Sequence, residues 1–85
     1  MRHVLYLVKS PLPFSADLLP PDRPGDQQVA VILIQDGVAQ QQVSADRVYV
    51  LEDDAVSRGI IPTYPTASYE DMLRMIFEAD SVIAL

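Results

Sequence analysis

The feature that most constrains the fold is an unbroken run of six apolar residues, Val29 to Ile34. Four of the six are β-branched. A short run of this composition, without polar alternation, is typical of a strand buried on both faces in the middle of a parallel sheet. The polar turn Gln35-Asp36-Gly37 follows at once, at what would be the carboxyl end of that strand. In open α/β sheets, ligands and partners usually meet the protein at that edge.

The rest of the chain alternates between strand and helix signals. Strands are predicted at 3–8, 47–51 and 81–85, with a further short strand possible within 60–66. A short helix is predicted from Glu52, with acidic residues at its amino end, Arg58 in its last turn and Gly59 in a left-handed cap position. Strands that alternate with helices favour an α/β layered domain with a mainly parallel four- or five-stranded sheet flanked by short helices.

The clearest helix follows Ser68, which is predicted to cap it together with Asp71 three residues later. Apolar residues recur there with helical spacing and form one face, which is expected to pack against the sheet: Tyr69, Met72, Leu73, Ile76 and Phe77. Five of the seven prolines lie between Pro11 and Pro24, so we expect only a short helix at 14–19 or an irregular connection. Residues 35–43 form either a short helix beginning near Gln35 or a solvated connection.

Length and composition limit the function. The 85 residues (1–85) are expected to form a single domain. The chain has no cysteine, which excludes disulfides, thiolate metal sites and a persulfide carried by this chain itself. The formal net charge is −6 and the six basic residues are scattered, so direct nucleic-acid binding is not expected. No apolar run approaches the ~20 residues of a membrane span, and we expect a soluble, cytoplasmic protein.

Signatures of catalysis are missing. The chain has only three glycines, and they are far apart in sequence. It therefore contains neither a dinucleotide-binding fingerprint nor a glycine-rich phosphate-binding loop. His3 has no metal-ligand spacing to other residues, Ser10 lacks an evident base, and Lys9 has no sign of burial. Asp53 and Asp54 could suggest a metal or acid–base pair, but no histidine is nearby in sequence, and the favourable position of acidic residues at the amino end of a helix is the preferred explanation. We therefore predict no catalytic residue, no cofactor and no metal.

Taken together, these stretches resemble the sulfur-relay family that includes the TusB and DsrH proteins. The matching motifs are Lys9-Ser10-Pro11, the stretch from Ile32 to Val38, and the stretch from Val48 to Gly59, which runs from a strand through an acidic-started helix to Arg58-Gly59. The helix at 69–76 and the short last strand also fit. The resemblance covers nearly the whole chain except the proline-rich segment.

The resemblance implies a fold related to DsrE and DsrF proteins, whose hexamers pass persulfide sulfur towards tRNA wobble-uridine 2-thiolation or within sulfur oxidation. Some DsrH-like members carry a cysteine late in the first helix, where this chain has Leu18 and Leu19. The implied role is a non-catalytic subunit, with DsrE/TusD-like and DsrF/TusC-like subunits or a second copy as partners. Candidate contact or landmark residues are Lys9, Ser10, Gln35, Asp36, Gly37, Asp53, Arg58 and Gly59. The alternative is a stand-alone homo-oligomeric module that binds a protein or a small ligand near 35–38.

Overall fold

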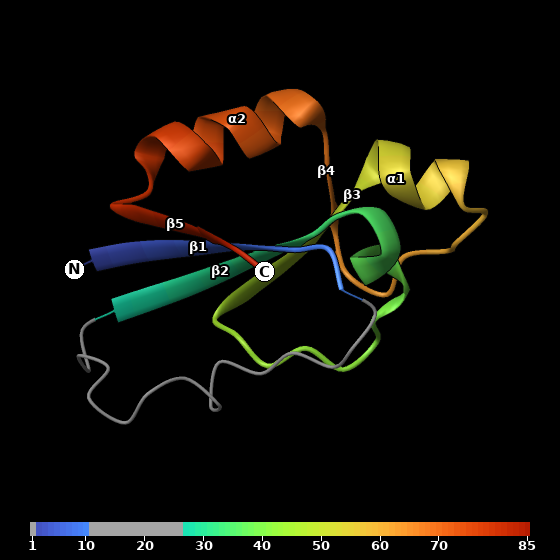
Figure 1. Ribbon diagram of the computed structural model, residues 1–85, viewed down its shortest axis with the longest axis horizontal. Coiled ribbons are helices and arrows are strands. Elements are labelled where there is room, and N and C mark those ends of the chain that lie inside the picture. The colour runs from blue at the N-terminus through green and yellow to red at the C-terminus, as the bar shows by residue number, and fades with distance from the viewer. Residues whose placement is uncertain (1, 11–26) are drawn as a thin grey trace.

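A computed structural model describes residues 2–10 and 27–85. The chain alternates between strands and helices, as Figure 1 shows. In chain order the elements are β1 (Arg2–Val8), β2 (Gln27–Leu33), the 3₁₀ helix η2 (Gln35–Ala39), β3 (Arg47–Leu51), α1 (Glu52–Ser57), β4 (Thr66–Ala67), α2 (Tyr69–Glu78) and β5 (Ser81–Ala84). The short helix predicted at 14–19 lies outside the described residues.

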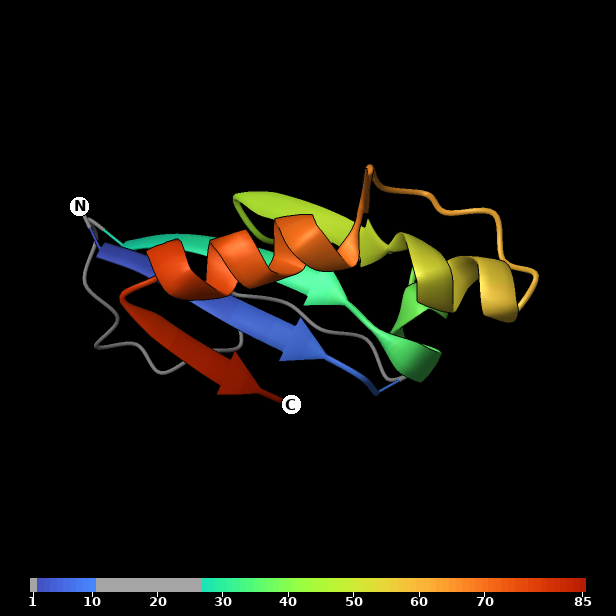
Figure 2. The same cartoon turned by 90° about the horizontal axis from the view of Figure 1, so that it is seen from above.

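The five strands form one sheet in the order β4-β3-β2-β1-β5, and every pair of neighbours is parallel. The predicted α/β domain with a mainly parallel sheet is therefore confirmed. Figure 2 shows β1, β2 and β5 pointing the same way, with α2 lying over β1 and β2. The apolar run that begins at Val29 supplies the middle strand, and Val29, Val31, Ile32 and Leu33 are fully buried. This confirms the central position predicted for that run.

The sheet has a hydrophobic cluster on each face. One cluster is centred on Leu5, Ile32 and Leu51, and α2 packs against it. The other contains alternate residues of the same strands, including Val4 and Val31, and the connections after η2 and α1 pack against it through residues such as Val43, Ala45, Ile60 and Tyr64. Strand β3 contributes Val48 and Val50 to one cluster and Tyr49 and Leu51 to the other, as its alternation predicts.

Helix α2 begins with the predicted capping box. The Ser68 hydroxyl oxygen accepts a hydrogen bond from the Asp71 backbone N–H, and the Asp71 carboxylate accepts one from the Ser68 N–H, each at 3.1 Å. These two bonds satisfy donors that the first turn of a helix leaves without partners. Local sequence thus determines where this helix starts.

The prediction that the whole apolar stripe of α2 packs against the sheet is wrong. Met72, Met75, Ile76 and Ala79 pack on the cluster around Leu5 and Ile32. Tyr69, Leu73 and Phe77 point elsewhere, and they are exposed by 50%, 50% and 85%. At about 100° per residue, these three lie on a neighbouring flank of the helix that a single sheet cannot reach. The apolar arc of α2 is wider than the surface it covers.

Helix α1 ends as its glycine predicts. Gly59 has φ +64°, the left-handed conformation that glycine adopts without a Cβ penalty, and its N–H donates to the Val56 carbonyl. Arg58, predicted in the last turn, is the residue that caps the carboxyl end. Residues 35–39 form the short helix that was one of the two alternatives, although Gly37, Val38 and Gln40 are buried and not solvated.

Candidate functional site

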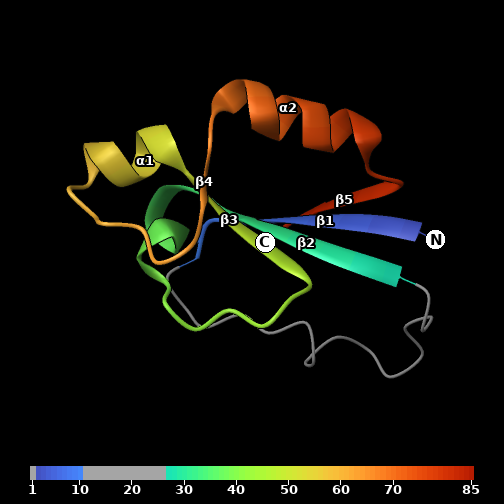
Figure 3. The same ribbon diagram turned by 180° about the vertical axis from the view of Figure 1, so that it is seen from behind.

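Most of the candidate landmark residues meet at the carboxyl edge of the sheet. Helices η2 and α1 lie beyond the ends of β2 and β3, and Figure 3 shows them next to each other there. The chain leaving β1 through Lys9 and Ser10 reaches the same edge. Residues that are separated by more than 20 positions in sequence are thereby brought into contact, as the parallel strand order requires.

The turn after β2 is held by a carboxylate from α1. Gln35 has φ 50°, an uncommon conformation for a residue with a side chain. Its backbone N–H donates to Asp54 Oδ2 at 2.7 Å, and the Asp54 side chain is only 18% exposed. A charged acceptor makes this a stronger bond than one between neutral groups. Asp54 therefore acts as a structural clamp on the turn.

Arg58 links both helices at this edge. Its Nε donates to Asp36 Oδ1 at 3.3 Å, and its Nη1 lies 3.9 Å from Asp54 Oδ1. Asp36 is largely exposed, so solvent screens its ion pair with Arg58. The landmark residues Gln35, Asp36 and Arg58 thus form one connected polar group whose contacts are internal to the protein.

Gly37 lies against the end of β1. A Cβ placed on it would be 2.2 Å from the Val8 carbonyl oxygen and 3.4 Å from that of Ser10. The buried Gln40 side chain reinforces this junction, because its Nε2 donates to the Ser10 carbonyl at 2.7 Å. The structure therefore requires glycine here for close packing between η2 and β1.

Lys9 and Asp53 lie at the margin of this group. Both side chains are exposed, and the described contact of Lys9 is made by its backbone N–H, which donates to the Leu85 carbonyl at 3.1 Å. Within residues 2–10 and 27–85, no group of three or more histidine, aspartate or glutamate side chains is arranged to hold a metal ion. The contacts described at this edge fasten η2 to α1 and β1, and they assemble no nucleophile with a base.

A second surface was missed from sequence. Tyr69, Leu73 and Phe77 are exposed on α2, and Val82, Ile83 and Leu85 are exposed on and after the edge strand β5. Val82 pairs with Leu5, a member of the cluster under α2, so its side chain is on the same face of the sheet as that helix. We call Tyr69, Leu73, Phe77 and Val82 the apolar strip. The helical spacing of Tyr69, Leu73 and Phe77 was visible in the sequence, but the sequence did not show that these side chains would be left exposed.

None of the helices in the described part of the chain has the length and apolar character that crossing a membrane would require. Comparisons of the chain with protein-family models, with curated proteins and with solved structures found no match.

Proposed function

We propose that this chain is a non-catalytic subunit of a cytoplasmic sulfur-relay complex. The observation that carries the proposal is the apolar strip on α2 and β5, which the described residues, 2–10 and 27–85, leave exposed. The motifs that resemble the TusB and DsrH family supply the pathway: persulfide transfer towards tRNA 2-thiouridylation or in sulfur oxidation. The apolar strip supports a role in binding another subunit, and the motifs support a role in sulfur relay.

The chemistry of the partner follows from composition. A persulfide relay needs a thiol, and this chain has no cysteine. The partner must therefore bring the cysteine, as a DsrE/TusD-like subunit would, with a DsrF/TusC-like chain completing the assembly. Aromatic side chains such as Tyr69 and Phe77 are the residue types that contribute most to stable protein interfaces.

Edge strand β5 favours a second candidate, association with another copy of the chain. Its sequence, Ser81 to Ala84, contains no charge and no proline, the features that usually prevent edge strands from pairing. Two copies related by a two-fold axis would each present the same strand and the same strip. This candidate is a homo-oligomeric binding module.

Native mass spectrometry with a cysteine-bearing DsrE-like subunit from the same host distinguishes the two candidates. A mixed complex supports the sulfur-relay proposal. Separate species in that mixture contradict it, and a dimer of this chain alone then supports the second candidate. Sedimentation of the chain alone, if strictly monomeric, contradicts the second candidate.

The variant Phe77→Ser tests the surface itself. We expect it to weaken the complex by about fivefold or more, because loss of an aromatic side chain at the centre of an interface costs about 1 kcal/mol or more. Val56→Ser is the matched control, since Val56 is 73% exposed on α1 and lies outside the apolar strip. Equal effects of the two substitutions would contradict the role assigned to the strip.

A further inference from the structure

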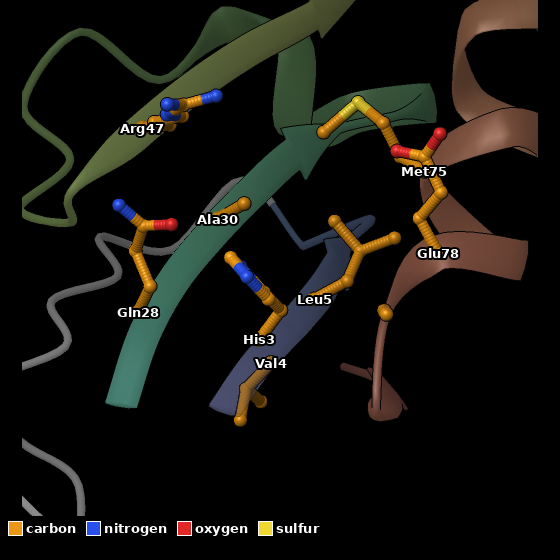
Figure 4. Close-up of a pocket in the computed structure, with 9 residues that line it drawn as sticks. His3, Val4, Leu5, Gln28, Ala30, Arg47, Met75 and Glu78 are labelled. Carbon is orange, nitrogen blue, oxygen red and sulfur yellow. The ribbon is translucent and has the colours of Figure 1, made fainter. Parts of the chain in front are cut away.

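A groove of about 250 Å³ lies at the opposite end of the sheet from the landmark residues. It is bounded by the amino-terminal halves of β1 and β2, by the start of β3, and by the last turn of α2. Figure 4 shows the side chains of Gln28 and Arg47 on one side of it, His3 and Leu5 in the middle, and Met75 and Glu78 on the helix side.

Strand register creates the hollow. Ala30 of β2 pairs with Leu5 on one side and with Arg47 on the other, so these three residues form one row across the sheet. The methyl group of Ala30 leaves space in the middle of this row. His3 and Gln28 form the next row on the same face, two residues earlier. The floor is therefore apolar and its rim is polar, an arrangement typical of small-molecule sites.

The polar groups on the rim have no described partners. Within residues 2–10 and 27–85, the side chains of His3, Gln28, Arg47 and Glu78 make no hydrogen bond or ion pair. The carboxylate next in sequence to Arg47, that of Asp46, accepts a hydrogen bond from the Val29 N–H. The guanidinium of Arg47 and the carboxylate of Glu78 are thus the two charges that face the groove.

This pair of charges selects the class of ligand. An anion would be attracted by Arg47 but repelled by the carboxylate of Glu78. A cation would be attracted by Glu78 but repelled by Arg47. A zwitterion satisfies both charges at once: its carboxylate matches the planar guanidinium and its ammonium matches the glutamate. The apolar floor of Leu5, Ala30 and Met75 suits an aliphatic side chain. The volume is below the 300–1,000 Å³ of sites for drug-sized ligands, which suits a molecule the size of an amino acid.

We propose that this groove binds a free aliphatic α-amino acid or a similarly small zwitterion, with Arg47 holding the carboxylate and Glu78 the ammonium group. The site is independent of the proposed partner surface. Met75 and Glu78 lie on one flank of α2, and Leu73 and Phe77 lie on the opposite flank. Ligand binding in the groove can therefore be measured on the chain alone. A failure of the proposed partner binding would not change the ligand binding that is expected here.

The test is a titration of the full ¹⁵N-labelled chain with L-leucine, followed by amide chemical shifts. We expect saturable shifts at Leu5, Ala30 and Ala79, which line the groove. Two analogues serve as probes of each charge: 4-methylpentanoate lacks the ammonium group and 3-methylbutylamine lacks the carboxylate. Each should bind roughly tenfold or more weakly than leucine, because each loses one charge-assisted contact.

Three variants connect the shifts to the proposed contacts. Arg47→Gln and Glu78→Gln should each weaken leucine binding roughly tenfold or more, and Ala30→Leu should abolish it by filling the floor. Arg74→Gln, which removes an exposed charge elsewhere on α2, is the control and should leave binding unchanged. The absence of saturable shifts, equal binding of the analogues, or equal effects of Arg47→Gln and Arg74→Gln would each overturn the proposal.

Discussion

Gly37 packs so closely against Val8 that an added Cβ would lie 2.2 Å from the Val8 carbonyl oxygen. That oxygen also accepts the Ile34 N–H at 2.9 Å, so it cannot move away without breaking a bond between β1 and the end of β2. We expect Gly37→Ala to lower the free energy of unfolding by roughly 2–3 kcal/mol or more. Urea denaturation measures the change.

Gly59→Ala is the matched control for that substitution. Gly59 has φ +64° but nothing within 4 Å of the added Cβ, so the cost is conformational only. About 1 kcal/mol is expected. If Gly59→Ala were the more destabilising of the two, close contact between η2 and β1 would not be the reason for glycine at 37.

The carboxylate of Asp54 should contribute more to stability than that of its neighbour. Asp54 accepts the Gln35 N–H at 2.7 Å and is mostly buried, whereas Asp53 is exposed and has no described hydrogen bond. Asp54→Ala should therefore cost about 1–2 kcal/mol, and Asp53→Ala less than about 0.5 kcal/mol. Both sit in the first turn of α1, so the comparison cancels the effect of the helix dipole. Thermal denaturation measures both losses of stability. Similar losses for the two variants would contradict the role of Asp54 as a clamp on the turn at Gln35.

Local and strongly apolar features were predictable from sequence. The run from Val29 identified the central strand because a short apolar run rich in β-branched residues, followed at once by a polar turn with glycine, is typical of a strand buried on both faces. The capping box at Ser68 and the cap at Gly59 were predictable because each depends on residues within four positions. The spatial meeting of Asp36, Asp54 and Arg58 followed only once the strand order was known.

Helix α2 shows why the remainder was not predictable. Its apolar periodicity shows which side of the helix is hydrophobic. It does not show how much of that side the sheet covers. Ile76 packs against the sheet and Phe77 does not, although both fit the same stripe. The groove presents the same difficulty, because it depends on Ala30 pairing with Arg47, and strand register is a long-range property.

The division of α2 into packed and exposed residues can be measured. Ile76→Ala removes a side chain that packs on the sheet and should cost about 2 kcal/mol. Phe77→Ser, at a position that is 85% exposed, should change the stability of the single chain by less than about 0.5 kcal/mol. Denaturation at low protein concentration separates these effects from association. A large loss for Phe77→Ser would mean that the residue is buried in solution.

The capping box predicts how stability depends on pH. The Ser68 backbone N–H, followed by the Ser68 hydroxyl and Arg74, lowers the pKa of Asp71 below its ordinary value. The unfolded chain therefore takes up this proton at a higher pH than the folded chain does. The stabilisation is present above the ordinary aspartate range, near ~4, and is lost as pH falls through the lower folded pKa.

Asp71→Asn should accordingly reduce the fall in stability below pH ~4. Urea midpoints across a pH series measure this slope. Glu70→Gln, which removes an exposed carboxylate from the same turn, is the control and should leave most of the slope in place. If both variants had the same slope as the wild type, the capping box would not be coupled to pH.

The hydroxyl group of Tyr64 joins two connections that cover the sheet. It accepts the Val43 N–H at 2.8 Å and lies 3.1 Å from the Gln41 carbonyl, to which it donates. Tyr64→Phe keeps the ring, which packs against the cluster that includes Val4 and Val31, but leaves the Val43 N–H without its acceptor. We expect a loss of about 1–2 kcal/mol in the free energy of unfolding.

Hydrogen exchange distinguishes this role from simple packing. In Tyr64→Phe the Val43 amide should exchange markedly faster. The exchange of amides in β2 should accelerate only as far as the loss of global stability requires. Tyr69→Phe, at an exposed position on α2, is the control and should change neither quantity. Unchanged exchange at Val43 would show that this hydroxyl does not hold the segment after η2 against the sheet.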